Sequence, residues 1–297
     1  MRFNVNAGAA PLLWRVMPAA FVLIWSTGFV VARFGMPHAP PLSFLALRFA
    51  LSALTFVIWI KLSHDVGWPR DRRQWGHLAM VGALTHAIYL GGVWAAVKAG
   101  MGAGTIALMA GLQPVLTAVW LSATGTQHRV SGRQWVGLLL GLGGLVLVLW
   151  RKLGLGELNA VNLSLGACAL LAITTGTLYQ KRFVAPCDVR SAVLIQLLAA
   201  LVLTLPFALL EQEPMVWHAE LLGALAWSVL MLTLAGSSML YLLVQRGAAT
   251  RVTSLLYLVP PCAALQGWLL FGESMSALVW LGMALTAVGV GLVVGRD

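Results

Sequence analysis

Charged residues are scarce in this chain, and the usual signatures of catalysis are missing from it. Only 9% of the 297 residues are charged, against about 25% in a typical soluble domain, and 60% are hydrophobic. Cys168, Cys187 and Cys262 stand far apart without metal-ligand spacing, and the six histidines form no cluster in the sequence. A glycine-rich phosphate loop, a Gly-x-Ser-x-Gly elbow, a His-Glu-x-x-His pair and paired carboxylates are also absent. We therefore expect no enzyme, no catalytic residue, no metal site and no cofactor.

Long apolar stretches make up most of the chain. Ten of them have roughly the 20 residues that an α-helix needs to cross a bilayer. They are too long for barrel strands and do not alternate apolar with polar residues, so helices are the only spanning structure that fits. We predict an all-α membrane protein with ten transmembrane helices, near residues 14–34, 41–60, 75–97, 101–123, 132–150, 162–180, 191–210, 221–244, 250–271 and 276–295.

The same five-helix unit is written twice in the sequence. WSTGF begins at Trp25 and ITTGT begins at Ile173, an offset of 148 residues, and the same offset places Arg48 opposite Gln196. The offset shrinks to 145 residues near the end of each copy, as changes in loop length would cause. A repeat of this kind indicates two copies of one structural unit rather than one continuous bundle.

The two copies are expected to be inverted relative to each other. Each copy contains five spans, an odd number, so the second copy enters the membrane from the opposite side. We assign the first five-helix repeat to residues 1–151 and the second to residues 152–297. Inverted repeats that surround a central cavity are the construction of many secondary transporters.

The basic residues that give the net charge of +10 are distributed as the topology of a membrane protein predicts, and not as a nucleic-acid-binding surface. With both termini placed inside, 14 Lys and Arg residues fall on the inner side and four on the outer side, and Arg48 lies within a span. Such an excess is the positive-inside rule. We therefore expect a multi-pass protein of the inner membrane with both termini in the cytoplasm, and no binding of nucleic acid.

Four segments carry a resemblance to a known family. They are IWSTGFVVARFG at 24–35, ALRFALSAL at 46–54, YLVPPCAALQGWLLFGE at 257–273 and GMALTAVGVGL from residue 282. Because these segments occur in this order and with this topology, the chain resembles the drug/metabolite transporter superfamily, in particular the ten-helix members built from two EamA-type repeats. The resemblance covers essentially the whole chain.

The resemblance implies a basket of helices around a central cavity. Helices 1, 3, 4, 6, 8 and 9 would line the cavity, and helices 5 and 10 would pack at the periphery. The implied substrates are small metabolites exported from the cytoplasm, with amino acids, aromatic ones included, prominent among them. The first repeat departs from the family pattern, since Thr126 and Gln127 stand where Gly-Glu is common.

Polar and aromatic residues within the spans are the candidates for a solute site. Such residues in a membrane usually face the bundle interior or a water-filled cavity. His86 and Tyr89 are three residues apart and share one face of helix 3. The alternative role for His86 and Tyr89 is a hydrogen bond between helices; the alternative for the serines is ordinary helix packing, and for Trp25 it is a position in the core. The candidate substrate-binding residues are Trp25, Ser26, His86, Tyr89, Gln113, Tyr179, Ser237, Tyr241 and Tyr257.

Two prolines and one arginine within the spans also call for an explanation. Pro114 and Pro260 occupy corresponding positions and predict kinks that serve either as hinges for alternating access or as static bends. Arg48 is the only cation deep in a span and suits a substrate carboxylate. Its correspondence with Gln196, on a helix outside the expected cavity ring, instead favours a structural role. That role is either a bond to the ends of neighbouring helices or snorkelling of the side chain to the outer interface.

The leading hypothesis is a transporter that exports small metabolites, foremost amino acids, by alternating access and facilitated diffusion. All nine acidic residues fall outside the spans or at their edges, whereas proton-driven pumps usually place Asp or Glu within the membrane. The alternatives are a carrier of another neutral or zwitterionic metabolite, such as a nucleoside or a nucleotide-sugar-like solute, and a proton-coupled antiporter that uses His86. The expected partners are the solute and the lipid bilayer. Glycine pairs such as Gly137 and Gly141 predict close helix packing, within a monomer or in a weak homodimer.

Overall fold

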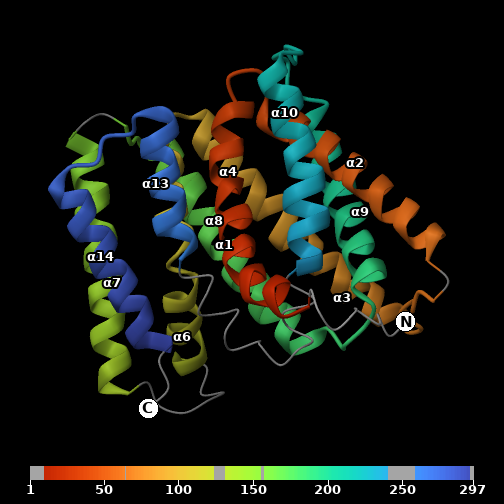
Figure 1. Ribbon diagram of the computed structural model, residues 1–297, viewed down its shortest axis with the longest axis horizontal. Coiled ribbons are helices and arrows are strands. Elements are labelled where there is room, and N and C mark those ends of the chain that lie inside the picture. Colours follow the sequence, from red (N-terminus) through yellow and green to blue (C-terminus); the bar gives the residue numbers. More distant parts are fainter. Residues whose placement is uncertain (1–9, 64, 124–130, 155–156, 240–257, 295–297) are drawn as a thin grey trace.

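The computed structural model describes residues 10–63, 65–123, 131–154, 157–239 and 258–294, and these residues form helices and loops without a strand (Figure 1). Within the described part of the chain, six helices are long and apolar enough to cross a membrane, and four shorter apolar helices accompany them. Each of the ten predicted spans overlaps one of these helical segments. The predicted all-α membrane fold is therefore confirmed.

Some spans consist of more than one helical element. In the first copy the elements are α1 (Ala10–Gly35), α2 (Pro41–Leu62), α3 (Arg72–Gly82), η1 (Ala83–Ile88), α4 (Tyr89–Lys98), α5 (Ala103–Ala110), α6 (Gln113–Ala123) and α7 (Gly132–Gly154). In the second copy they are α8 (Ala160–Phe183), α9 (Val189–Ala208), α10 (Ala219–Trp227), η2 (Ser228–Gly236), α13 (Val259–Phe271) and α14 (Ala277–Val294).

Short polar residues fix where several helices begin. Asn159 and Asn162 form a reciprocal capping box at the start of α8. The Asp188 side chain accepts a hydrogen bond from the Arg190 backbone N–H at the start of α9. Pro41 occupies the first turn of α2, where its missing N–H leaves no hydrogen bond unmade. These caps mark the span boundaries within an otherwise almost continuous apolar sequence.

The first helices of the two copies run in opposite directions. Lys98 Nζ, at the end of α4, donates to the Met36 carbonyl just after α1 at 2.9 Å. Asn162 Nδ2, in the first turn of α8, donates to the Ala99 carbonyl at 3.2 Å. The end of α1 and the start of α8 therefore lie at the same end of the molecule, as inverted repeats require. We call it the outer end, since the distribution of Lys and Arg predicts that it faces away from the cytoplasm.

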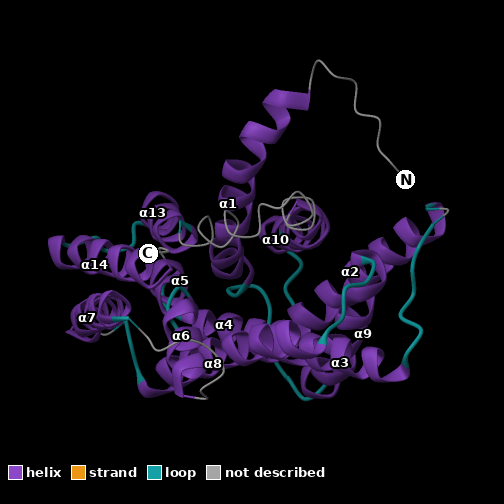
Figure 2. Cartoon of the chain, turned by 90° about the horizontal axis from the view of Figure 1, so that it is seen from below, coloured by secondary structure: helices purple, strands orange, loops and turns teal. Residues whose placement is uncertain are grey.

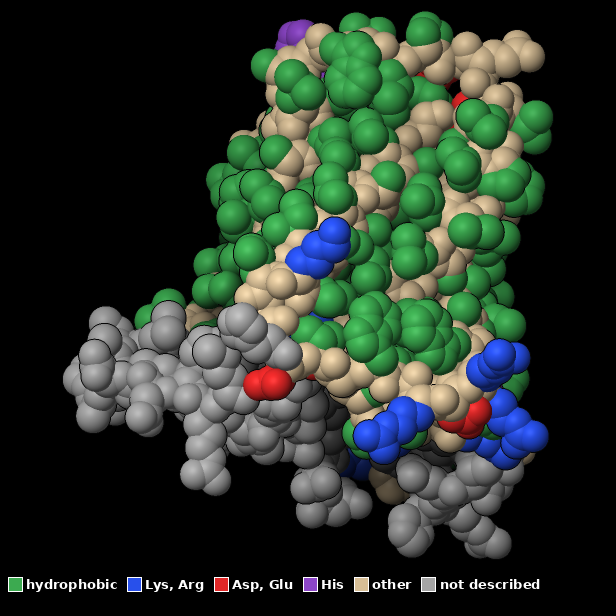
Figure 3. Space-filling view, turned by 90° about the vertical axis from the view of Figure 1, so that its right-hand side faces the viewer, with side chains coloured by type: hydrophobic (Ala, Val, Ile, Leu, Met, Phe, Trp, Pro, Cys, Tyr) green, Lys and Arg blue, Asp and Glu red, His purple; other side chains and the backbone are tan. Residues whose placement is uncertain are grey.

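The opposite, inner end joins the α2–α3 loop to the α8–α9 loop. Ser191 Oγ donates to the Gly67 carbonyl at 2.8 Å, and Arg190 Nη2 donates to Asp188 Oδ2 at 2.6 Å. Burial opposes the charge of Asp188, yet hydrogen bonds from Arg190 and Gly67 hold the pKa of its carboxyl below its usual range. Most Lys and Arg side chains on the face drawn in Figure 3 gather at this end, below a broad hydrophobic surface. That distribution is the one expected of a protein embedded in a bilayer.

A buried carboxylate joins three helices near the outer end. Glu273 follows the left-handed C-cap Gly272 of α13. Its Oε1 accepts from Arg33 Nη1 of α1 at 2.6 Å and from the Ala103 backbone N–H at 2.7 Å, and its Oε2 accepts from the Gly104 N–H at 3.3 Å. A carboxylate at a helix N-terminus satisfies free N–H groups and the positive end of the helix dipole. Glu273 therefore fixes α1, α5 and α13 to one another across the two repeats.

Glycines bring α7 and α14 into backbone contact. A Cβ on Gly144 would meet the Gly282 carbonyl, and a Cβ on Gly289 would meet the backbone of Gly137 and Gly141. Both views place this pair at one edge of the molecule, opposite α2, α3 and α9 (Figure 1, Figure 2). The peripheral position expected for helices 5 and 10 is thus what the structure shows, and the Gly137 and Gly141 pair packs helices within one chain.

The third span of each copy contains a π-helical segment. These segments are η1 and η2, and Thr85 of η1 corresponds to Thr233 of η2 at the repeat offset of 148 residues. In each segment the threonine hydroxyl donates to a backbone carbonyl of the preceding turn, Thr85 to Val81 at 2.8 Å and Thr233 to Ser228 at 2.9 Å. π-Helical turns are rare and frequently occur at functional sites. Sequence periodicity gave no indication of them.

Candidate substrate-binding cavity

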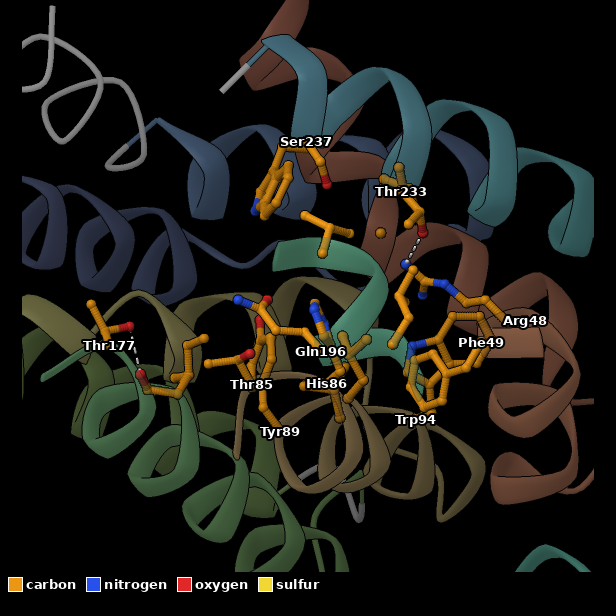
Figure 4. A pocket seen from close by; sticks show the side chains of 18 of the residues that line it. Arg48, Phe49, Thr85, His86, Tyr89, Trp94, Thr177, Gln196, Thr233 and Ser237 are labelled. Atoms are coloured by element: carbon orange, nitrogen blue, oxygen red, sulfur yellow. Dashed lines mark hydrogen bonds between the residues drawn. The ribbon is translucent and has the colours of Figure 1, made fainter. Parts of the chain in front are cut away.

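A cavity of about 450 Å³ lies between the first three spans of both copies. Its described lining residues come from α1, α2, η1, α4, α8, α9 and η2, together with Ser237 just beyond η2 (Figure 4). This volume lies within the roughly 300–1,000 Å³ that is typical of small-molecule sites. Corresponding spans of the two repeats thus contribute to one site, as the inverted-repeat construction predicts.

The expected ring of cavity helices needs a correction. Helices 2 and 7, which are α2 and α9, do line the cavity, whereas α5, α6 and α13 supply none of its described lining residues. The reason is close packing between helices 4 and 9. A Cβ on Gly104 of α5 would lie 2.9 Å from the Ala264 Cα of α13, so these helices fill the space between them with their own backbones.

Four of the nine predicted substrate-binding residues meet at this cavity. Trp25 comes from α1, His86 from η1, Tyr89 from α4, and Ser237 follows η2. His86 and Tyr89 both line the cavity, as the shared helix face predicted, although the backbone between them passes from π-helical to α-helical. The arrangement combines an indole, an imidazole, a phenol and a hydroxyl around one space, which suits a solute with both an apolar body and polar groups.

Three other predicted residues form hydrogen bonds between helices and are not among the described lining residues. The Ser26 hydroxyl accepts from Gln266 Nε2 of α13 at 2.9 Å, and Gln113 Nε2 of α6 donates to Thr177 Oγ1 of α8 at 2.8 Å. Both bonds are the interhelical alternative that polar residues in spans allow. Any contact of Ser26 or Gln113 with a solute remains a prediction.

The third of these residues, Tyr179, lies toward the inner end of α8. Its hydroxyl lies 2.8 Å from His77 Nδ1 of α3, and its ring packs against Phe183. Tyr179 thereby connects the sixth span to the third. Tyr241 and Tyr257 lie outside the described residues, so their roles stay predictions.

Close helix packing positions the polar groups of the cavity. A Cβ on Gly82, the last residue of α3, would meet the backbone of Gln196 on α9. This contact places the Gln196 amide beside the His86 imidazole (Figure 4). Thr85 and Thr233 add the two π-helical segments to the lining. None of Gln196, Thr85 and Thr233 was among the predicted substrate-binding residues.

The structure corrects the interpretation of Arg48, which was placed outside the cavity. Arg48 lies among the lining residues, and only 7% of its surface is exposed. Its Nη2 lies 3.5 Å from Thr233 Oγ1, and its guanidinium carbon lies 5.9 Å from the ring centroid of Trp94 (Figure 4). Trp94 is in turn stacked on Phe44, with ring centroids 4.4 Å apart. Arg48 thus points inward, so snorkelling to the outer interface does not describe it.

The predicted hinges lie near each other. The helix of span 4 is interrupted between α5 and α6, just before Pro114, whose missing N–H leaves the turn without one hydrogen bond. A Cβ on Gly111, inside this interruption, would lie 2.6 Å from Pro260 Cγ. Pro260 occupies the first turn of α13, and the residues before 258 lie outside the described part. The two prolines therefore belong to one contact region, and their role as hinges remains a prediction.

The fold also brings together residues that sequence spacing did not group. His38, His218 and Glu220 have potential ligand atoms within 4.8 Å of one another at the outer end. His38 Nε2 is already 2.8 Å from Glu220 Oε2, and His218 caps α10 by accepting from the Glu220 N–H. These contacts account for the cluster as a link between the α1–α2 loop and α10, and they do not add a metal site to the cavity.

A family model with the description "EamA-like transporter family" matches two stretches of the chain, residues 13–150 and 161–295. The chain belongs to the EamA-like transporter family. It is a membrane transporter, and the resemblance noted in its sequence is confirmed. The two matched stretches lie on either side of the α7–α8 connection. The two stretches that match the family model are thus the two copies whose spans line the cavity of this EamA-like transporter.

Relatives cover nearly the whole chain at low identity. The inner membrane transporter YedA of Escherichia coli (strain K12) is 26% identical over an alignment of 278 positions that covers 92% of this chain and 88% of that protein. A "probable amino-acid metabolite efflux pump" of the same organism is 22% identical, with 93% and 92% covered. A solved crystal structure superposes with a TM-score of 0.64 at 22% identity, covering 94% of this chain and 96% of that one. The last comparison supports the fold of this EamA-like transporter.

Proposed function

We propose that this transporter exports amino acids, aromatic ones included, from the cytoplasm by alternating access. The observation that carries the proposal is the composition of the cavity lining. Trp25 and Tyr89 offer aromatic surface, backed by the buried rings of Phe49 and Trp94, and His86, Gln196 and Thr233 offer hydrogen-bonding groups. Relatives from Escherichia coli and Salmonella typhimurium, 22% and 23% identical, carry the name of probable amino-acid metabolite efflux pumps. The name and the lining point to the same solute class.

The proposed mechanism is facilitated diffusion. Among the described residues that line the cavity there is no Asp or Glu, the residues that usually carry protons in membrane pumps. Glu273 is buried, but it is engaged by Arg33 and by the first turn of α5, and it is not one of the described lining residues. The concentration gradient of the solute would then drive net export.

Two alternatives have specific support. His86 lines the cavity, so proton-coupled antiport through its imidazole is the second candidate mechanism. A neutral or zwitterionic metabolite such as a nucleoside is the second candidate solute, because a base stacks on aromatic side chains as an aromatic amino acid does. A nucleotide-sugar-like solute would bring more negative charge than the described lining neutralises.

The test is transport by purified protein in liposomes. Labelled phenylalanine, leucine, glutamate, lysine and uridine would be measured separately, with and without a pH gradient, and against liposomes without protein. We expect uptake of phenylalanine, faster than in protein-free liposomes, that persists without the pH gradient. If uridine is taken up and none of the amino acids is, the solute class is nucleosides and the amino-acid proposal is rejected. If uptake stops when the pH gradient is dissipated, facilitated diffusion is rejected in favour of proton coupling through His86.

A further inference from the structure

The cavity contains one permanent cation whose charge is not neutralised by any described residue. Arg48 is buried, and its Nε has no hydrogen-bond partner among the described residues. Its contact to Thr233, at 3.5 Å, is at the limit of a hydrogen bond. An arginine has five N–H donors in a planar fork, so this environment uses little of its capacity.

The surroundings of Arg48 are apolar or neutral. The Arg48 guanidinium lies over the Trp94 ring of α4. Phe49, which follows Arg48 on α2, lines the cavity beside it (Figure 4). Ser52, one turn further along α2, and Ser228 on η2 are also buried with hydroxyl oxygens that have no partner among the described residues. Unsatisfied polar atoms therefore lie on both of the elements that meet at Arg48, α2 and η2.

An uncompensated cation at this depth needs an anion or an equivalent set of dipoles. Charged residues within membranes almost always pair with another group or mark the path of a substrate. Among the described residues, the ion pairs of Arg33 with Glu273, Lys98 with Glu213 and Arg190 with Asp188 all lie outside the cavity. No described acidic residue lines the cavity, so the anion has to come from the solute.

We propose that Arg48 binds the carboxylate of the transported solute and makes small aromatic monocarboxylates the preferred substrate class. The proposal rests on the proposed transport function and deepens it. A planar guanidinium accepts a carboxylate through two parallel hydrogen bonds, which gives both strength and orientation. A single permanent cation matches a monoanion better than a phosphate dianion. Trp25 and Tyr89, which are only partly buried, supply the surface for an aromatic ring, and the buried Phe49 and Trp94 lie behind them in the cavity wall.

The charges in the cavity also indicate that the solute does not need an α-ammonium group. The described lining offers no carboxylate to an α-ammonium group, which can meet only neutral oxygens and aromatic faces there. An aromatic acid that lacks the ammonium group therefore binds about as well as the amino acid, within roughly threefold in Kd. The carboxylate, by contrast, is essential to binding.

The test compares 3-phenylpropanoate with its neutral isostere 3-phenylpropanamide on purified wild-type protein in detergent, by calorimetric titration. We expect the Kd of the carboxylate to be lower than that of the amide by about tenfold or more. This difference is the one expected when a charge-assisted pair of hydrogen bonds to Arg48 is lost. Phenylalanine and phenyl phosphate are measured in parallel. Equal Kd values for the acid and the amide, or no binding of either, would overturn the proposal. Tighter binding of phenyl phosphate would overturn the assignment to carboxylates.

Substitutions then assign the effect to one residue. Arg48→Gln should abolish the difference between acid and amide, and Arg48→Lys should retain part of it. Arg182→Gln is the matched control, since Arg182 is exposed at the end of α8 and is not a described lining residue. An acid preference that survives in Arg48→Gln would overturn the proposal.

Chemical labelling provides a second test that does not depend on folding of the variants. Phenylglyoxal modification of Arg48 in the wild-type protein, followed by peptide mass spectrometry, should be slowed by 3-phenylpropanoate and not by the amide. Equal labelling of Arg48 with both ligands would contradict the assignment.

Measurement of flux in liposomes distinguishes failure of this proposal from failure of the proposed transport function. Amino-acid flux without an acid preference rejects the role of Arg48 alone, and an acid preference without any flux rejects the transport function alone.

Discussion

Replacing Glu273 by Gln tests whether one buried carboxylate holds the two repeats together at the outer end. The change keeps the volume, removes the ion pair with Arg33 at 2.6 Å and weakens the acceptor for the Ala103 N–H at 2.7 Å. Breaking a buried ion pair costs about 3–5 kcal/mol. The Arg33 side chain is 36% exposed and that of Glu273 only 5%, so water compensates part of the loss on the arginine side. We expect a loss of about 2–3 kcal/mol in the free energy of unfolding.

The matched control is Glu213→Gln at the same end of the molecule. Glu213 pairs with Lys98 at 2.5 Å, but its side chain is 49% exposed, and exposed pairs contribute about 0–1 kcal/mol. Unfolding of both variants by SDS in mixed micelles, followed by tryptophan fluorescence, measures the difference. The reasoning is refuted if Glu273→Gln unfolds at the same SDS fraction as wild type, or if the two variants lose equal stability.

Three further predictions concern transport and topology. Tyr89→Phe and His86→Ala should each weaken the apparent affinity for phenylalanine in liposomes roughly three- to tenfold, the loss of one hydrogen bond, with unchanged amounts of folded protein. Trp150→Phe, on the exposed surface of α7, should leave transport unaffected, and normal transport in both cavity variants would show that Tyr89 and His86 are structural. Dissipating the pH gradient should leave the initial rate of phenylalanine flux unchanged, and a rate that falls to the protein-free level would reject facilitated diffusion. Reporter fusions at Asp297 and in the linker 151–161 should lie on opposite sides of the membrane, and a shared location would reject the predicted topology.

The sequence alone predicted the fold well, because the dominant physical signals in a membrane protein are long-range and simple. Span length follows from bilayer thickness, and a backbone in hydrocarbon leaves no alternative to helices. The repeat offset indicated two copies, and the odd number of spans in each copy indicated that they are inverted. The structure agrees with the offset down to Thr85 and Thr233, which occupy corresponding π-helical segments. The π-helical segments could not be predicted from the sequence, because the extra residue in a π-helical turn is not marked by a characteristic residue type or spacing.

The site was predicted only in part, because the rotation of an apolar helix about its axis leaves little trace in the sequence. α2 is apolar around most of its circumference, so nothing in its pattern indicates that Arg48 faces inward. Arg48 and Gln196, which correspond in the two copies, both line the cavity, although their helices were expected to lie outside it. Whether Arg48 has a structural or a functional role remains a prediction. Ser26 and Gln113 show the converse difficulty, since a polar group in a span is satisfied as well by a neighbouring helix as by a solute.

The glycine contact between α7 and α14 has a mechanical consequence. At Gly144 and Gly282 the two backbones touch with no side chain between them, so a slide of one helix along the other would drive larger residues into gaps that fit only hydrogen. α7 belongs to the first repeat and α14 to the second, and the pair lies at the edge of the molecule (Figure 1). In the proposed alternating-access mechanism the repeats rock against each other, and we expect the displacement to be smallest at this contact and to grow with distance, toward the helices that surround the cavity.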